Sequence, residues 1–173
     1  MEVIIITGTP GTGKTFLAKR LGRLLNYPVI GGEALIKKFS LAERFDRKRK
    51  TYLVDEKKFA RAAQQEIKKA HRANLQGIII ESHLSHEIPS QSVGLCLVTM
   101  CDVKVLHARL KQRKYGKEKI KENLEAEIFQ VCLEEARANH HRVAVINTTQ
   151  RINNTVLSFI EKLLWKSAKK QKN

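Results

Sequence analysis

Apolar residues along this chain fall into short unbroken runs that alternate with stretches of helical spacing. The runs cover residues 3–7, 27–30, 78–80, 93–100 and 143–147, and helical spacing covers residues 14–25, 56–74, 103–113, 123–139 and 152–166. A short unbroken apolar run is typical of a strand that is buried on both faces, as in a parallel sheet. The alternation therefore predicts an α/β fold of three layers, with a parallel sheet of about five strands and helices on both faces. We expect one domain over residues 1–173.

Some segments break this alternation. Residues 33–54 and 114–121 have weak periodicity and many lysines and arginines, so we expect irregular basic loops there. Residues 83–92, which include Pro89, are also expected to form a loop.

The first loop carries a motif with chemical meaning. Residues 8–15, GTPGTGKT, match GxxxxGK[ST] and lie between an expected strand and an expected helix. Glycines let the backbone curl so that successive N–H groups face phosphate oxygens, and the positive end of the helix dipole adds to this attraction. Lys14 would reach the β- and γ-phosphates, and the hydroxyl of Thr15 would bind Mg²⁺. The sequence predicts a nucleoside triphosphate site.

An acidic residue stands at the end of an expected apolar strand. Glu81 follows the run 78–80, where phosphate-loop proteins place a carboxylate that holds the magnesium shell or orients a water molecule. A helix-capping or surface acid is the alternative. His83 could polarise a water molecule or touch phosphate, and it could equally be a loop histidine with ordinary partners.

Two arginines point to a lid over the triphosphate. Arg109 and Arg113 are four residues apart on an expected helix, directly before the basic segment 114–121. Their guanidinium groups could neutralise charge on the transferred phosphoryl group. An exposed basic helix face is the alternative, but the local concentration of basic residues favours the lid. Thr148 follows the last expected strand, where the base of a nucleotide could be held, and a plain turn is the alternative.

The charge of the chain is unevenly distributed. The 33 lysines and arginines outnumber the 17 acidic residues, for a net charge of +16. Residues 37–72 hold 13 basic and five acidic residues, and residues 104–121 hold eight basic residues and one acidic residue. Single exposed lysines are ordinary on solvated helices, but two concentrated segments indicate surfaces that meet polyanions, either nucleotide phosphates or RNA.

Cysteine and histidine patterns do not predict a metal centre. Cys96, Cys101 and Cys132 are odd in number and lack CxxC spacing, so we expect free thiols rather than disulfides or a zinc site. The order Glu81-x-His83-x-x-His86 does not match HExxH, and no further ligand cluster is visible in the sequence.

The sequence shows no membrane segment. No apolar run reaches the roughly 20 residues of a membrane span, and no basic stretch precedes the first run as in a signal peptide. We expect a monomer in the cytoplasm, and in the nucleus as well if the cell is eukaryotic, with no membrane contact.

Several segments together resemble a known family. TGTPGTGKT, GGEAL, LVDEKKF, IIIESH, ARLKQRKY and above all ENLEAEIFQVCLEEA are similar to the atypical adenylate kinases, called adenylate kinase isoenzyme six or coilin-interacting nuclear ATPase in animals. The resemblance spans residues 3–165, and the EIFQVxxEEA helix is far more particular than the phosphate loop. It implies a fold like that of nucleoside monophosphate kinases, with adenylate kinase and ATPase activities. It also implies a part in maturation of the small ribosomal subunit, with a ribosomal protein and rRNA as partners.

The motifs and the resemblance together imply roles for particular residues. Residues 31–54 would form the monophosphate-binding segment for AMP, and residues 112–122 the lid. The monophosphate contacts would be Gly32, Glu33, Lys37 and Asp55. ATP would contact Gly11, Thr12, Gly13, Lys14, Thr15, Phe16, Arg113 and Thr148, and Mg²⁺ would be held by Thr15 and Glu81. Catalysis would depend on Lys14, Arg109, Arg113, Glu81 and His83.

The chain departs from the family pattern near the acceptor site. Glu81 stands where the family has the aspartate of a DxH signature, and GGEALIKK replaces a GDLxR stretch, so Lys37 or Lys38 would have to serve for an arginine. An arginine of typical adenylate kinases is missing from ESHLSHEIP. Lysine cannot reproduce a bidentate arginine–phosphate contact. Three hypotheses follow: an adenylate kinase that also hydrolyses ATP, a nucleotide-switched ribosome assembly factor, and a kinase for another nucleoside monophosphate.

Overall fold

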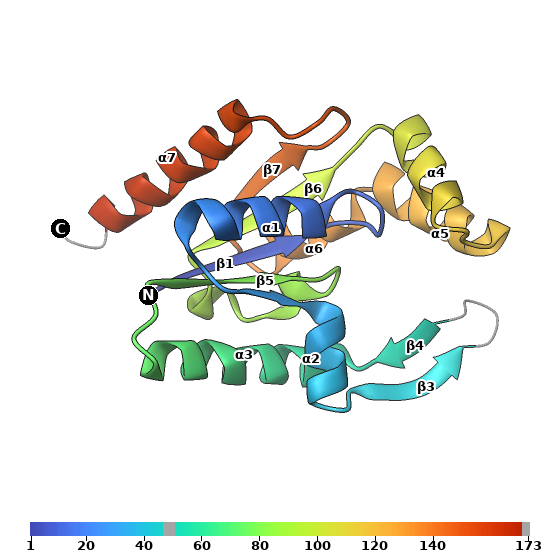
Figure 1. Ribbon diagram of the computed structural model, residues 1–173. Coiled ribbons are helices and arrows are strands. Elements are labelled where there is room, and N and C mark those ends of the chain that lie inside the picture. The colour runs from blue at the N-terminus through green and yellow to red at the C-terminus, as the bar shows by residue number, and fades with distance from the viewer. Residues whose placement is uncertain (47–50, 171–173) are drawn as a thin grey trace.

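Five strands form one parallel sheet through the centre of the molecule (Figure 1). In spatial order they are β2 (Val29–Gly31), β5 (Gly77–Glu81), β1 (Glu2–Thr7), β6 (Leu95–Met100) and β7 (Val143–Asn147), and every neighbouring pair is parallel. The computed structural model describes residues 1–46 and 51–170. The predicted parallel sheet is confirmed, and β1, which leads into the phosphate loop, is its central strand.

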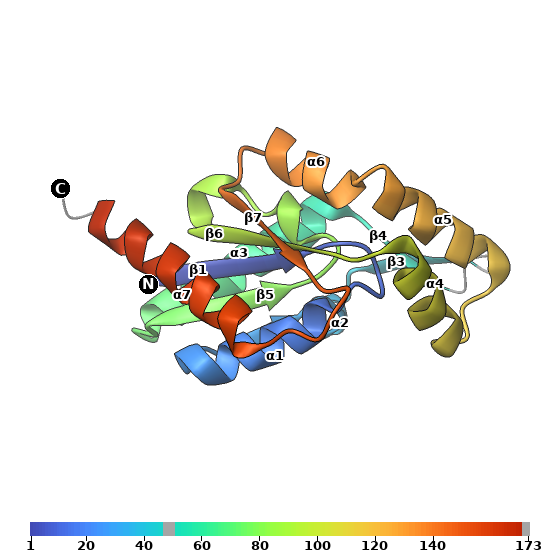
Figure 2. The same cartoon turned by 90° about the horizontal axis from the view of Figure 1, so that it is seen from above.

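Helices cover both faces of this sheet, as Figures 1 and 2 show from two directions. Ile4 and Ile6 of β1 pack on the face that carries α1 (Lys14–Leu25) and α7 (Asn154–Lys170). Val3 and Ile5 pack on the other face, which carries α3 (Glu56–Arg72) and α6 (Val131–Ala138). Burial of each such side chain stabilises the fold by roughly 1.5–3 kcal/mol, which explains why the strand is apolar at successive positions. The predicted three-layer fold is confirmed.

Shorter elements gather at the carboxyl ends of the strands (Figures 1 and 2). They are the helices α2 (Gly32–Lys38), α4 (Val103–Gln112) and α5 (Lys117–Ile128), and a hairpin of β3 (Ala42–Asp46) with β4 (Thr51–Val54). Two 3-10 turns, η1 (Ser85–Glu87) and η2 (Ser90–Ser92), follow β5. Ligands of open parallel sheets bind at this end, so these elements surround the expected site.

The structure corrects the expectation of irregular loops. Residues 33–54 hold most of α2 and the β3–β4 hairpin, except for residues 47–50, which lie outside the described part of the chain. Most of the basic segment 114–121 belongs to α5, in which Ile120 is a buried apolar residue. Elements that bury so little apolar surface leave only a weak periodic signal, and the sequence pattern therefore missed them.

The prediction of a single helix over residues 123–139 is also wrong. This segment lies in two helices, α5 and α6, which are separated at Gln130, where φ is 54°. No glycine or proline marks this break, so the apolar periodicity runs through it unchanged.

Within residues 1–46 and 51–170, every helix is too short or too polar to cross a lipid bilayer.

Candidate active site

The phosphate loop joins the central strand β1 to helix α1. Gly8 has a φ of 136° and Gly13 a φ of 93°, which are backbone conformations that side chains with a Cβ rarely adopt. A Cβ on Gly8 would collide with the carbonyl oxygen of Thr99. Gly13 is the N-cap of α1 and makes no side-chain cap. The first-turn N–H groups of α1 therefore face the loop without a side-chain acceptor from the cap, and such a terminus can hold an anion.

Threonines from three parts of the chain support this loop. The Thr12 hydroxyl donates to the carbonyl oxygen of Thr9 at 2.8 Å and lies 2.7 Å from the Thr99 hydroxyl of β6. The Thr148 hydroxyl donates to the carbonyl oxygen of Thr12 at 2.5 Å. These contacts connect the loop to the ends of β6 and β7, so its shape is set before a nucleotide arrives.

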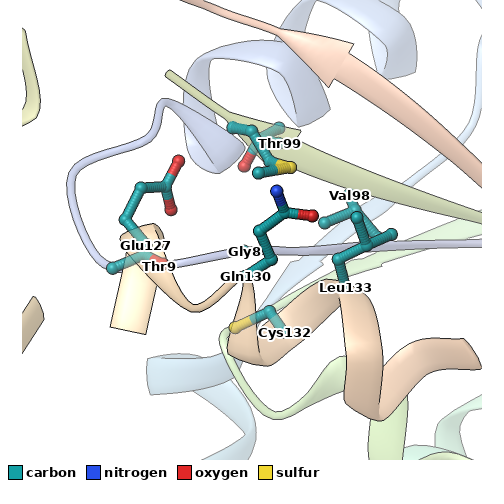
Figure 3. A pocket seen from close by; sticks show the side chains of 9 residues that line it. Gly8, Thr9, Val98, Thr99, Glu127, Gln130, Cys132 and Leu133 are labelled. Atoms are coloured by element: carbon teal, nitrogen blue, oxygen red, sulfur yellow. The ribbon is translucent and has the colours of Figure 1, made fainter. Parts of the chain in front are cut away.

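A small cavity lies against the loop. Figure 3 shows Glu127, Gln130 and Cys132 gathered around Gly8 and Thr9. The cavity has a volume of about 10 Å³, which is close to the space that one water molecule needs. The buried carboxylate of Glu127 accepts from the backbone N–H of Cys101 at 2.8 Å and so connects α5 to the end of β6.

Lys14 is folded back over the phosphate loop. Its Nζ donates to the carbonyl oxygens of Gly8 at 2.7 Å and Thr9 at 3.1 Å. Burial lowers the pKa of Lys14 to about 8. A polyphosphate would offer this ammonium group negatively charged acceptors in place of neutral carbonyls, so binding should favour its protonated form.

We expect ATP to bind about tenfold more weakly at pH 9 than at pH 7, because the free protein must take up a proton at Lys14 above its pKa of about 8.

The free energy of unfolding depends on pH in the opposite sense. The lowered pKa means that the unfolded chain binds more protons between about pH 8 and the ordinary lysine value, so this group adds stability as pH rises through that window. Calorimetric titration with ATP in two buffers of different ionisation enthalpy measures the proton uptake that accompanies ATP binding. A Lys14→Met variant should lose it, and an unchanged uptake in that variant would exclude Lys14 as the source.

Glu81 and Thr15 present oxygen atoms side by side at the end of β5. The Thr15 hydroxyl donates to Glu81 Oε1 at 3.1 Å. The strand register places Glu81 opposite Ile6, near the start of the loop. Burial raises the pKa of Glu81, and the hydrogen bond from Thr15 and the charge of Lys14 act in the opposite direction. A hydroxyl and a carboxylate are hard oxygen donors of the kind Mg²⁺ prefers, so these two residues fit a magnesium ion.

His83 lies two residues beyond Glu81, and the residue reaches solvent although protein atoms surround part of its side chain. Desolvation by the surrounding atoms, with the positive charges of Lys14 and Lys119, lowers the pKa of His83. The imidazole is therefore neutral at pH 7, with one nitrogen able to accept a proton or a hydrogen bond. Both interpretations from the sequence, a group that orients water and an ordinary loop histidine, fit this environment.

An open cleft of about 460 Å³ lies beside the phosphate loop. Its lining includes Arg109 and Arg113, the two predicted lid arginines. The Arg109 guanidinium donates to the carbonyl oxygen of Thr148 at 2.6 Å and to its hydroxyl at 3.3 Å, so it connects α4 to the segment after β7. Arg113 directly follows α4. The structure thus brings both arginines and Thr148 to one cleft, with Arg109 and Thr148 bonded to each other.

Phe16 forms part of the wall of this cleft. The residue is 48% exposed, and the guanidinium of Arg20 lies 5.9 Å from the centroid of its ring. An exposed flat ring beside a phosphate loop can pack against a purine base.

The four residues predicted to bind the monophosphate occupy different positions. Gly32 begins α2 against Ser82, and Glu33 lies in the first turn of the same helix. Lys37 is exposed in the last turn. Asp55 is the N-cap of α3, where its carboxylate accepts from the backbone N–H of Lys58 at 2.8 Å. Asp55 therefore has a structural part in starting α3.

The neighbour of Lys37 is already engaged. Lys38 forms an ion pair with Glu66 of α3, with Nζ 2.7 Å from the carboxylate oxygen. Of the two lysines that could replace the family's arginine, Lys37 is the better placed to meet a ligand.

The sequence pattern missed several residues of the cleft and of the loop support. The cleft lining also includes Gln112, which lies in the predicted lid, and Gln150, Arg151 and Ile152. The last three follow Thr148 after the carboxyl end of β7, where the base of the nucleotide was expected, and of these Arg151 and Ile152 were not predicted. Thr99 and Glu127 reach the loop only through tertiary contacts, so the sequence carries no comparable signal for them.

Comparisons with known proteins support this description. Residues 4–130 match the family model described as an AAA domain. The chain is 41% identical over 134 residues to the adenylate kinase isoenzyme 6 homolog of Schizosaccharomyces pombe, covering 78% of this chain and 73% of that protein. It is 32% identical over 160 residues to the adenylate kinase isoenzyme 6 homolog of Dictyostelium discoideum, covering 91% and 88%.

A solved structure shares the fold. The deoxyadenosine kinase of M. mycoides with bound dATP superposes with a TM-score of 0.58 at 13% identity, covering 94% of this chain and 99% of that one. The predicted phosphate-loop fold is confirmed, and so is the resemblance read from the motifs. The chain belongs to the adenylate kinase isoenzyme 6 family.

Proposed function

We propose that this chain is an ATP-dependent kinase that transfers the γ-phosphate of ATP to AMP and also hydrolyses ATP. The observation that carries this proposal is the phosphate loop with its surroundings. Lys14 bonds to the carbonyl oxygen of Gly8 in the loop, and Thr15 at the start of α1 bonds to Glu81 at the end of β5. The names of its relatives favour a kinase-type phosphotransferase. We assign it to the cytoplasm, or also to the nucleus of a eukaryotic cell, as a monomer.

ATP would occupy the phosphate loop and the adjoining cleft. Its phosphates would lie on the amides of residues 11–15, and Phe16 would pack against the base. Arg113 would reach the phosphates from the lid, residues 112–122. Arg109 would position the cleft wall through its bonds to Thr148 and would add positive charge.

AMP would approach from the opposite side, over residues 31–54. Gly32 and Glu33 stand at the start of α2, and Gly31 pairs with Glu81 in the sheet, so this segment begins beside the phosphate loop. Lys37 would attract the AMP phosphate as a single charge. Because Asp55 caps α3, we assign it the weaker contribution of positioning this segment.

In the transfer step an oxygen of the AMP phosphate forms a bond to the γ-phosphorus of ATP, and the bond to the β–γ bridging oxygen breaks to release ADP. Lys14 and Arg113 would stabilise the negative charge on the transferred group, and no strong general base is needed. Thr15 and Glu81 would hold the Mg²⁺, which neutralises phosphate charge when it is bound. In hydrolysis water replaces AMP, and Glu81 or the neutral His83 would orient it.

A second candidate function is a nucleotide-switched factor for assembly of the small ribosomal subunit. The distribution of basic residues favours it, with 13 in residues 37–72 and eight in residues 104–121. Several lie on α3 and α5, which contribute no residue to the lining of the cleft. In this case a ribosomal protein and rRNA would be the partners, and kinase turnover would be incidental.

One experiment separates these functions. ATP consumption is followed with a panel of nucleoside monophosphates, with water alone, and with small-subunit protein or rRNA added. We expect AMP to give the fastest turnover, and His83→Gln to slow hydrolysis about tenfold or more while changing AMP transfer less. Stimulation by the ribosomal components, with RNA binding that weakens steeply with salt, would favour the assembly factor. Brisk turnover with another monophosphate and little with AMP would overturn the assignment of AMP.

A further inference from the structure

Three side chains of metal-binding type meet between η1 and α6, beside the phosphate loop, where Cys132 also lines the small cavity described above. They are His86, Cys132 and Glu135, and their ligand atoms all lie within 4.8 Å of one another. His86 Nε2 lies 2.9 Å from Glu135 Oε2. The histidine is 3% exposed, whereas the side chain of Glu135 is 49% exposed, so the group is open to solvent on one side.

From this arrangement we propose a zinc site formed by His86 Nε2, Cys132 Sγ and Glu135 Oε2. Imidazole nitrogen, thiolate sulfur and carboxylate oxygen together are the donor set of Zn²⁺, while Mg²⁺ and Ca²⁺ prefer oxygen alone. The site is thus chemically distinct from the Thr15–Glu81 oxygen pair.

The distances suit a tetrahedral ion after small side-chain adjustments. With bonds of about 2.0–2.3 Å to nitrogen, oxygen and sulfur, ligand atoms around zinc lie roughly 3.3–3.8 Å apart. The His86–Glu135 contact of 2.9 Å must widen slightly, and the Cys132 thiol lies within 4.8 Å of the other ligand atoms. Glu87 Oε1 lies 3.4 Å from His86 Nε2 but outside the group of mutually close ligand atoms, so a water molecule would be the fourth ligand.

The backbone of His86 is already held in place. Its carbonyl oxygen accepts from Asn139 Nδ2 at 2.9 Å and lies 2.8 Å from His141 Nε2. The ring is oriented by Thr7, whose hydroxyl lies 2.8 Å from His86 Nδ1. A metal-binding histidine usually bonds to a polar group through its second ring nitrogen, and Thr7 meets that requirement.

Thr7 also permits the change in protonation of His86 that zinc binding requires. Without metal, His86 Nε2 donates to Glu135, so Nδ1 accepts from the Thr7 hydroxyl. With zinc on Nε2, Nδ1 carries the proton and donates to Thr7. The Thr7 hydroxyl is then free to donate to the neighbouring Cys132 sulfur or to the carbonyl oxygen of His83 at 3.5 Å. The Cys132 thiol proton is released to solvent, as is usual when zinc binds cysteine.

Zinc at this position would connect three parts of the fold. His86 lies on η1, five residues beyond Glu81, while Cys132 and Glu135 lie on α6. Thr7 is the last residue of β1 before the phosphate loop. The ion would therefore hold α6 and the segment after β5 against the central strand.

Titration of the metal-free full-length protein with Co²⁺ and with Zn²⁺ tests the proposal. We expect one equivalent of Co²⁺ to give the intense visible bands of tetrahedral coordination and a near-ultraviolet thiolate charge-transfer band, both lost on adding Zn²⁺. Saturating Zn²⁺ should raise the melting temperature by about 5–10 °C at a hundredfold excess over its dissociation constant. Cys132→Ser and Glu135→Gln should each weaken Zn²⁺ binding at least about 100-fold, since loss of an outer partner alone costs about 10- to 100-fold.

Matched controls separate this site from adventitious binding. Glu134→Gln removes a neighbouring carboxylate of α6 that pairs with Arg137 instead, and Cys101→Ala removes a thiol outside the group. Both should bind Zn²⁺ as the unaltered protein does. The proposal is overturned if Co²⁺ gives no thiolate band, or if Cys132→Ser and Glu135→Gln bind Zn²⁺ unchanged. Because these readouts do not use ATP, they remain valid if the proposed kinase activity fails.

Discussion

Replacing Lys14 with alanine is expected to lower the rates of AMP phosphorylation and ATP hydrolysis by at least about 100-fold. Removal of a single charge-stabilising donor from a phosphoryl or acyl transfer site typically costs 10²–10³ in kcat. Lys14 lies directly against the loop carbonyls, with Nζ 2.7 Å from the oxygen of Gly8. Both reactions develop charge on the same phosphoryl group, so both should fall together. Initial rates with AMP and with water alone measure the effect.

The fold should survive this substitution. Lys14 is a desolvated cation whose pKa is lowered by burial, and its replacement removes that cost together with two hydrogen bonds. We therefore expect a melting temperature close to that of the unaltered protein. Lys162→Ala, which removes an exposed lysine of α7, should leave both rates unchanged. Turnover retained by Lys14→Ala would refute the proposed part of this lysine in both reactions.

Replacing Gly8 with alanine is expected to abolish ATP binding and to lower the free energy of unfolding by roughly 2–4 kcal/mol. The φ of 136° at Gly8 is unfavourable for alanine, and the added Cβ would collide with the carbonyl oxygen and hydroxyl of Thr99. The backbone cannot yield without breaking the Thr99 contacts to Thr7 and Thr12 that shape the loop. Urea unfolding and calorimetry with ATP measure the two effects.

Gly116→Ala is the matched control for this change. Gly116 has a φ of −66°, and a Cβ there would have no neighbour within 4 Å. The same methyl group should change the free energy of unfolding by less than about 1 kcal/mol, because the lower entropy of the unfolded chain is offset by the poorer capping of α5 by alanine. If Gly8→Ala bound ATP as well as Gly116→Ala does, the loop geometry described above would not be required for nucleotide binding.

The positions of Lys14, Thr15 and Glu81 were open to prediction from sequence for a physical reason. A phosphate loop is encoded by neighbouring residues, because its glycines, its lysine and its helix start must follow one another directly. Glu81 was found because a polar residue at the end of an apolar strand lies, in a parallel sheet, at the same edge as the loop after β1. The proximity of Thr15 and Glu81, 3.1 Å apart, agrees with that expectation.

Elements that bury little apolar surface were not open to the same method. The hairpin β3–β4, the helix α2 and the start of α5 face solvent over much of their length, so their sequences carry charge instead of a clear period. The break at Gln130 left no signal either, since glutamine is an ordinary helix residue. Ile120 on one side of the break and Leu133 on the other belong to different apolar clusters, so the two helices pack against different parts of the fold.

The sequence alone determined the class of fold, the phosphate loop and the family, since each follows from the order and spacing of residues along the chain. Only the tertiary structure decided which distant residues meet. It joined Arg109 to Thr148, Thr12 to Thr99, and Cys132 and Glu135 to His86. Residues far apart in the chain become neighbours only when the sheet and its helices close on their shared apolar core. Spacing along the sequence does not predict which residues then become neighbours.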